Sequence, residues 1–244
     1  MISRDDRVTM MLDKGIGLRV QADTLDTAVP YITMVKIGWG IGKIIPDKIL
    51  KEKVSAYKNA GLIVSPGGTA LEKAILQDEL DIFFAWLKSS GFNAVEVSNG
   101  VIEIGEDEKC DLIHDLRRRG FTVLSEVGSK DPLRDREIMI EDRCDAIQKE
   151  LDAGSWKVIV EAREGGKGIG FFDDRGNILK DELSRFLKIA GWKDIIFEAP
   201  LKSQQVFFIK EIGADVNLGN IPYDEILPLE TLRQGLRGDT LKLL

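Results

Sequence analysis

Glutamates, lysines and an arginine directly follow short apolar runs in this sequence. In "VIVEAREGGKGIG" three apolar residues lead into Glu161 and Arg163, and in "LSEVGSK" a similar run leads into Glu126 and Lys130. Carboxylate oxygens are ligands of hard cations such as Mg²⁺, and guanidinium and ammonium groups bind phosphates and carboxylates. The pattern therefore predicts a site for a divalent cation and a small anion.

Eight apolar runs are followed by polar or charged residues in this way. The charged ones are four carboxylates and four cations, namely Glu96, Glu126, Glu161, Glu198, Lys14, Lys36, Lys130 and Arg163. Burial of an unpaired ion is costly, so charges that share one cavity are expected to pair with each other, bind a metal or bind a charged substrate. Each one alone is explained equally well as a helix cap or a structural ion pair, but this explanation is much weaker for all eight together.

The other reactive side chains favour no different chemistry. His114 is the only histidine and lies in a helical pattern remote from these positions, where a structural or surface role is expected. Cys110 and Cys144 lack the neighbouring cysteine or histidine of a zinc site. The glycines that follow Arg163 resemble a phosphate-binding loop, but neither GxxxxGK(S/T) nor GxGxxG is present, and a mobile loop explains them as well.

The apolar runs have the spacing of alternating strands and helices. They begin near Val8, Tyr31, Leu62, Phe92, Phe121, Trp156, Asp194 and Ala214. The steps range from 20 residues (194 to 214) to 38 residues (156 to 194), around the roughly 30 that a strand, a helix and two turns need. Between the runs, as in residues 69–91, apolar positions recur at three- and four-residue steps before a glycine, which predicts a helix.

Eight such units favour a closed α/β barrel over a doubly wound sheet, which usually has five or six strands. The chain has 244 residues, close to the roughly 250 that are typical of this barrel. We therefore predict a single (βα)8 TIM barrel domain over residues 1–244. The active site of such a barrel lies at the carboxyl ends of its strands, where the charged residues occur.

The composition excludes several kinds of partner. The formal net charge of −7 disfavours binding to nucleic acid or to an anionic membrane surface. No apolar run approaches the roughly 18 residues of a membrane span, and the first residues, "MISRDDRVTM", lack the apolar stretch of a signal peptide. These features predict a cytoplasmic protein that acts on small molecules.

Several motifs, taken together and in order, resemble those of the phosphosulfolactate synthase family, the ComA type. They are "LDKG", "VKIGWG", "PGGT", "VEVSNG", "SEVGSK", "EAREGGKGIG", "FEAPLKSQQ", "VNLGNI" and "LETLRQGLRGDT". They cover essentially the whole chain, and several are long and unusual in composition. One departure is Leu201, where some relatives are expected to have a polar residue.

The resemblance implies a (βα)8 barrel that adds sulfite to phosphoenolpyruvate with Mg²⁺. The product would be (2R)-phospho-3-sulfolactate, in a first step towards coenzyme M or sulfolactate. The resemblance also implies a homo-oligomer, such as a trimer, and places the catalytic lysine of the family at Lys130.

The chemistry of this reaction assigns roles to the charged residues. Arg163 is expected to bind the phosphate or carboxylate, and Lys130 is expected to donate a proton as general acid. The candidate Mg²⁺ ligands are Glu126, Glu161 and Glu198. The further candidate substrate contacts are Lys14, Lys36, Lys202, Ser203, Gln204, Asn217, Gly219 and Asn220.

Two alternatives remain open from the sequence. A lysine at a strand end could instead form a Schiff base, as in a class I aldolase. The chain could also be a non-catalytic or stress-related barrel of the same family that acts through a contact surface. The complete set of strand-end charges argues against the second alternative, because a site without function need not keep such costly groups.

Overall fold

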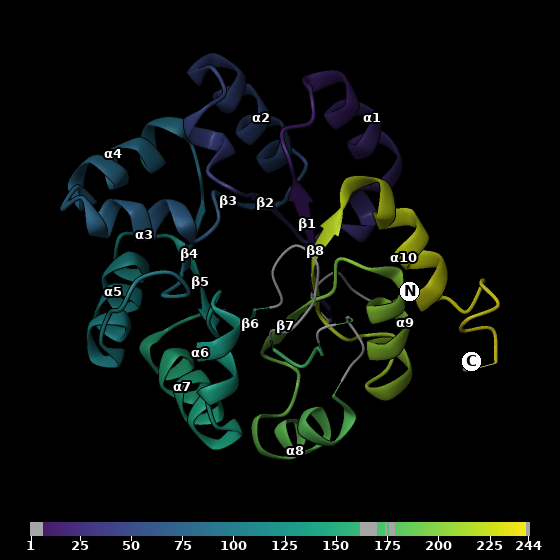
Figure 1. The fold of residues 1–244 in the computed structure, drawn as a ribbon. Helices are drawn as coiled ribbons and strands as arrows, with labels where there is room; N and C mark the ends of the chain where they lie inside the picture. Colours follow the sequence, from purple (N-terminus) through teal and green to yellow (C-terminus); the bar gives the residue numbers. More distant parts are fainter. Residues whose placement is uncertain (1–6, 162–169, 174, 176–178, 243–244) are drawn as a thin grey trace.

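Eight parallel strands form the barrel that the sequence predicts (Figure 1). The computed structural model describes residues 7–161, 170–173, 175 and 179–242. The strands are β1 (Thr9–Asp13), β2 (Met34–Ile37), β3 (Ile63–Ser65), β4 (Ala94–Val97), β5 (Thr122–Val127), β6 (Lys157–Val160), β7 (Ile195–Glu198) and β8 (Leu218–Pro222). All eight predicted strands are confirmed, and the largest offset is at the eighth, which was expected near Ala214 and begins at Leu218.

Helices surround the strands and cover the outside of the barrel (Figure 1). They are α1 (Leu18–Ala28), α2 (Asp47–Asn59), α3 (Thr69–Leu76), α4 (Leu80–Ser90), α5 (Glu106–Arg118), α6 (Pro132–Glu137), α7 (Ile140–Ala153), α8 (Lys180–Ala190), α9 (Lys202–Glu211) and α10 (Ile226–Arg233). Short 3-10 turns occupy Val29–Tyr31, Ile41–Lys43 and Tyr223–Glu225.

The helical pattern of residues 69–91 forms two helices, α3 and α4, and not the one helix that its periodicity predicts. Asp78 adopts a left-handed conformation with φ of 54° and ends α3. The backbone N–H groups of Asp78 and Glu79 then bond to the carbonyls of Ile75 and Ala74. This bonding pattern is that of a Schellman motif, in which an aspartate can replace the usual glycine.

The strands pair in the order β3-β2-β1-β8-β7-β6-β5-β4. In the described part of the chain no strand pairing joins β3 to β4, and side chains bridge the two strands instead. Asn93 accepts a hydrogen bond from the Val64 N–H at 2.7 Å, and Glu96 accepts one from the Gly68 N–H at 2.8 Å. Glu96 thereby links the end of β4 to the loop after β3.

The inside of the barrel consists of an apolar layer beneath a charged one. The apolar side chains form a buried cluster that includes Met10, Met34, Ala94, Leu124, Ile159 and Ile196. Side chains two positions apart in a strand point to the same face. The inward-facing pairs are Met34 with Lys36, Ala94 with Glu96, Leu124 with Glu126, Ile159 with Glu161, and Ile196 with Glu198. The apolar layer therefore forms a dry floor below the charges.

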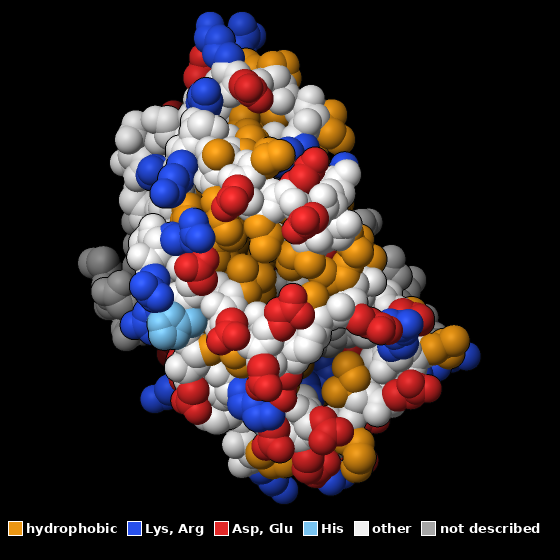
Figure 2. All heavy atoms as spheres, turned by 90° about the vertical axis from the view of Figure 1, so that its left-hand side faces the viewer, with side chains coloured by type: hydrophobic (Ala, Val, Ile, Leu, Met, Phe, Trp, Pro, Cys, Tyr) orange, Lys and Arg blue, Asp and Glu red, His pale blue; other side chains and the backbone are white. Residues whose placement is uncertain are grey.

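A further apolar surface lies on the outside of the barrel, over α3 and α4 (Figure 2). It includes a groove of about 500 Å³ whose lining contains Trp39, Ile44, Ile82 and Phe83. Lys43 also lines this groove, and its ammonium lies 3.8 Å from the ring centroid of Trp86. Among the helices described, none is both long and apolar enough to span a bilayer.

Candidate active site

A cavity of about 310 Å³ opens at the carboxyl ends of the strands, above the apolar floor. It is lined by Leu12, Lys36, Gly38, Trp39, Pro66, Gly67, Gly68, Thr69, Glu96, Val101, Glu126, Lys130, Glu161, Glu198 and Asn220. Residues from all eight predicted strand-end segments thus meet in one place. Polar groups that converge above an apolar base are typical of an enzyme site.

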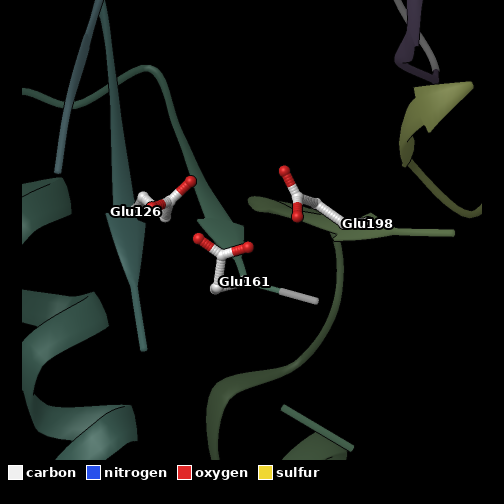
Figure 3. Close-up of side chains that lie close together, drawn as sticks. All are labelled: Glu126, Glu161 and Glu198. Atoms are coloured by element: carbon white, nitrogen blue, oxygen red, sulfur yellow. The ribbon is translucent and has the colours of Figure 1, made fainter. Parts of the chain in front are cut away.

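Three glutamates face one another in this cavity (Figure 3). Glu126 and Glu198 lie on β5 and β7, and Glu161 directly follows β6. One carboxylate oxygen from each lies within 4.8 Å of the others, and all three side chains are buried. Burial, followed by the charges of Glu126 and Glu198, raises the pKa of Glu161 well above its usual value.

Lys36 is buried beside two carboxylates of the cavity, Glu96 and one of the three facing glutamates, Glu198. Its Nζ lies 3.1 Å from Glu96 Oε2 and 3.0 Å from Glu198 Oε1. Burial lowers the pKa of Lys36, but the neighbouring glutamates, first Glu96 and then Glu198, outweigh burial and hold this pKa well above its usual value. Lys36 is therefore a fixed ammonium that anchors Glu198.

Lys130, in the loop after β5, contacts the other two of the three facing glutamates and a glutamate of α3. Its Nζ lies 3.5 Å from Glu126 Oε1, 3.8 Å from Glu161 Oε2 and 3.4 Å from Glu72 Oε1. Burial opposes the charge on Lys130, but these carboxylates, led by Glu126, raise its pKa above the usual value. The side chain is 22% exposed, so its ammonium can meet a ligand that enters the cavity.

The described part of the site has more negative than positive charge. Five carboxylates, those of Glu72, Glu96, Glu126, Glu161 and Glu198, surround two ammonium groups, those of Lys36 and Lys130. The equal count of charges that the sequence predicts is therefore not found here, partly because Arg163 lies outside the described residues. Buried like charges repel, so a divalent cation among the three facing glutamates would stabilise them.

The donor set fits a hard cation such as Mg²⁺. Its candidate ligands are carboxylate oxygens, which Mg²⁺ prefers over nitrogen or sulfur. Glu126 Oε1 is buried and has no hydrogen-bond partner among the described residues, although Lys130 lies 3.5 Å away. A bound cation would satisfy this oxygen.

The chain is also similar in sequence to known proteins. A sequence model of the (2R)-phospho-3-sulfolactate synthase family matches residues 2–239. The chain belongs to this family. It is 47% identical over 238 residues to a phosphosulfolactate synthase of Methanothermobacter thermautotrophicus, a match that covers 98% of this chain and 92% of the relative.

A phosphosulfolactate synthase of Methanocaldococcus jannaschii is 45% identical over 233 residues, which cover 96% of this chain and 93% of the relative. Among solved structures, the YdjI aldolase of Escherichia coli shares the fold with a TM-score of 0.57 and 11% identity, over 99% of this chain and 86% of that one. The likeness to the aldolase shows the fold alone. Membership of the phosphosulfolactate synthase family identifies the chain as an enzyme.

The candidate substrate contacts divide between the cavity and other places. Lys36 and Asn220 line the cavity. Asn220 has a left-handed backbone with φ of 55°, and its Oδ1 is buried without a hydrogen-bond partner in the described ranges. Lys14 is exposed near the cavity, with its Nζ 4.8 Å from the ring centroid of Trp39.

The candidate contacts from the segment after β7 do not line the cavity described. Lys202 forms an ion pair with Asp239 at 2.7 Å, and Ser203 is exposed at the start of α9. Gln204 is buried and accepts a hydrogen bond from the Leu201 N–H at 3.0 Å, which satisfies a free donor at the start of this helix. These three residues therefore lie at the start of α9, outside the cavity described.

Asn217 and Gly219 were predicted to contact the substrate, but neither lines the cavity described. The Asn217 side chain bonds to the backbone of Val8, Lys193 and Ile195, at the opposite end of the barrel. A side chain on Gly219 would lie 2.5 Å from Met10 Cε, so this glycine makes room for the apolar floor. The motif places both residues near a strand end, but the strand begins at Leu218 and leaves them below the cavity.

Asp13 also follows an apolar run, but the structure gives it a structural role. Its carboxylate accepts hydrogen bonds from the Gly15 and Ile16 N–H groups and from the Tyr57 hydroxyl. Lys53, on α2, pairs with it at 2.8 Å, and both side chains are buried. This network joins α2 to the end of β1.

We expect the Lys53→Met variant to lose about 3 kcal/mol of unfolding free energy, because removal of one partner leaves a buried charge. Urea unfolding followed by circular dichroism measures this loss. The matched control is Lys48→Met on the same helix, since Lys48 is 86% exposed. Equal stabilities of the two variants would contradict the structural role of the pair.

Sequence reasoning missed Glu72. It lies within α3 and not at a strand end, yet it is buried and contacts Lys130. The available signal was its position next to Leu71 on the apolar face of a helix, where a glutamate is costly unless it is paired. Its partners, in the loops after β4 and β5, could not be recognised from the sequence.

Proposed function

We propose that this enzyme adds sulfite to phosphoenolpyruvate with Mg²⁺ and forms (2R)-phospho-3-sulfolactate. The observation that carries the proposal is the convergence of Lys130 with Glu126, Glu161 and Glu198 in one cavity of a member of this family. The cavity of about 310 Å³ is of a size suited to small molecules.

Both substrates are anions, so their approach must be assisted by positive charge. Two unit charges about 4 Å apart repel by roughly 4 kcal/mol at an effective dielectric of 20. The described cavity has excess negative charge, which makes a divalent cation a requirement of the proposal. Lys36, Lys130 and Arg163 supply further positive charge, and Arg163 is proposed to bind the phosphate or carboxylate.

The chemical step forms a carbon–sulfur bond and then a carbon–hydrogen bond. The sulfur lone pair of sulfite attacks the methylene carbon, and the electron pair of the double bond moves to C2 and the carboxylate. Lys130 then transfers a proton from Nζ to one face of C2 and regains a proton from solvent. The carboxylates around Lys130 keep it charged before the transfer, as a general acid requires.

Glu126, Glu161 and Glu198 are proposed to hold the Mg²⁺, directly or through water. A divalent cation there would stabilise the negative charge that develops on the substrate carboxylate. Lys36 fixes the orientation of Glu198, because its Nζ bonds to Oε1 at 3.0 Å.

Phosphorus NMR tests the function directly. A mixture of purified protein, phosphoenolpyruvate, sulfite and Mg²⁺ is expected to lose the phosphoenolpyruvate signal and gain that of phosphosulfolactate. Samples that lack one component should show no new signal. Unchanged phosphoenolpyruvate in the complete mixture, under conditions where the protein is folded, would refute the proposal.

A Schiff-base aldolase reaction has weaker support. A lysine must be neutral to attack a carbonyl, but carboxylates hold Lys36 and Lys130 as ammonium ions. Borohydride added with a carbonyl substrate would leave an adduct, visible by mass spectrometry, only if such an intermediate formed. A non-catalytic role is disfavoured, because the buried charges of the cavity have no structural need to converge.

The cellular setting is proposed from the family resemblance and the composition. We expect a cytoplasmic homo-oligomer, such as a trimer, whose product enters the formation of coenzyme M or sulfolactate. Sedimentation velocity of the purified protein measures the number of subunits.

A further inference from the structure

The side chain of Lys130 is held by three residues that the predicted set of site residues does not include. They are Gly100, in the loop after β4, and Thr69 and Glu72, in the first turn of α3. We call this group the Lys130 cradle.

Gly100 forms the floor of the Lys130 cradle. Its carbonyl accepts a hydrogen bond from the Lys130 N–H at 3.0 Å, which fixes the backbone. A Cβ on Gly100 would lie 3.1 Å from Lys130 Cγ and 3.3 Å from both Cδ and Cε. The lysine stem therefore lies against the space that the missing side chain leaves, and a Cβ there would force the stem to shift by a few tenths of an ångström.

Thr69 and Glu72 receive the ammonium group. Lys130 Nζ lies 3.2 Å from Thr69 Oγ1 and 3.4 Å from Glu72 Oε1. The two residues are three positions apart in α3, so their side chains lie on the same face of the helix. The two contacts restrict the direction in which Nζ can point.

Glu72 is itself fixed in place. Its Oε2 accepts hydrogen bonds from the backbone N–H groups of Val101 and Ile102 at 2.8 and 3.1 Å, and Oε1 accepts one from the Ser98 hydroxyl. The side chain is 2% exposed. A buried carboxylate with this many donors has little freedom to rotate, so it can hold the ammonium at a defined place.

We infer that Glu72 is a positioning residue for Lys130, acting with Thr69 and Gly100. The inference rests on the proposed function, in which Glu126 and Glu161 bind the cation. Glu72 is neither one of the three facing glutamates nor a residue of the cavity lining, so it is the carboxylate that remains to hold Lys130 when the cation is bound. The Lys130 cradle aims the proton at one face of C2.

Double-mutant cycles with Lys130→Ala test this inference. Glu72→Gln keeps an oxygen for the Val101 and Ile102 N–H groups but removes the charge next to Lys130, and Gly100→Ala displaces the lysine stem. Each variant alone is expected to lower kcat by roughly 10- to 100-fold, with KM changed less than about threefold. In the Lys130→Ala background, neither change should lower kcat further.

Additive effects in the Lys130→Ala background would overturn the inference, because they would show that Glu72 and Gly100 act independently of Lys130. Thr69→Val provides a third cycle if Glu72→Gln does not fold, since the side chain of Thr69 bonds to Lys130 and, among the residues described, not to the loop around Val101. The control is Glu103→Gln in the same loop, which removes an exposed ion pair with Arg134 and should leave kcat unchanged.

Crystal structures of Gly100→Ala and Glu72→Gln separate this inference from the proposed function. Lys130 Nζ should be displaced from Glu72 and Thr69 in both variants, whatever reaction the enzyme catalyses. An unmoved ammonium would reject the Lys130 cradle, whereas a displaced ammonium in a protein without synthase activity would reject only the proposed function.

Discussion

The Lys130→Ala variant is expected to have a kcat about 100-fold lower than that of the wild type, or lower still. Among the lysines described in the cavity, Lys130 is partly exposed, and the carboxylates around it hold it as an ammonium. Its loss would therefore remove the proton donor for C2. Phosphorus NMR or a phosphoenolpyruvate-consumption assay measures the change.

The matched control for this variant is Lys149→Ala. Lys149 lies on α7 and pairs with Glu106 at 2.5 Å on the surface, with its side chain 56% exposed. Such exposed pairs contribute little to stability, so this variant should have wild-type activity. If Lys130→Ala also retained full turnover while folded, Lys130 would have no part in the mechanism.

Removal of divalent ions with EDTA is expected to abolish product formation, and Mg²⁺ should restore it. Glu161→Gln should reproduce much of this loss, with at least about a tenfold fall in metal affinity, because it removes one of three facing carboxylates. Isothermal titration calorimetry with Mg²⁺ measures the affinity without the reaction. Full activity after EDTA treatment would exclude the metal assignment.

The affinity for Mg²⁺ should also depend on pH in a defined direction. A carboxylate must lose its proton to bind the cation, and burial together with Glu126 and Glu198 raises the pKa of Glu161. The affinity should therefore fall as the pH falls through this raised pKa, at a higher pH than for an exposed glutamate. The control variant Glu141→Gln, which removes a surface pair with Arg185, should show the wild-type dependence.

The two layers inside the barrel explain why these charges can be concentrated. Ile159 and Ile196 close the barrel below Glu161 and Glu198, and all four side chains are buried. Electrostatic interactions are stronger in such a site than in water. The same burial that raises the pKa of Glu161 therefore strengthens its attraction to a cation.

The barrel and the three facing glutamates could be predicted from the sequence. Repeated apolar runs at the spacing of strand and helix units determine eight strands, and each inward side chain follows from the two-residue period of a strand. Glu126, Glu161 and Glu198 occur at the same place in three successive units, so the closed barrel necessarily brings them together.

The errors arose where position along the chain is a poor guide to position in space. Asn217 and Gly219 belong to a motif near a strand end, but the start of β8 at Leu218 leaves them below the cavity. Lys202 follows β7, but its partner Asp239 comes from the C-terminal segment and directs it elsewhere. One residue of shift reverses the face of a strand side chain, and apolar patterns do not determine a boundary so finely.

The sequence by itself determined the order of the elements and the carboxylates at the ends of β5, β6 and β7, because local periodicity and strand-end position are encoded in neighbouring residues. Only the tertiary structure decided that Glu72 and Gly100 would contact Lys130, and that Lys36 would pair with Glu96 and Glu198. These contacts join residues 30–162 positions apart, and they depend on the register of the strands and the placing of α3, which no local pattern specifies.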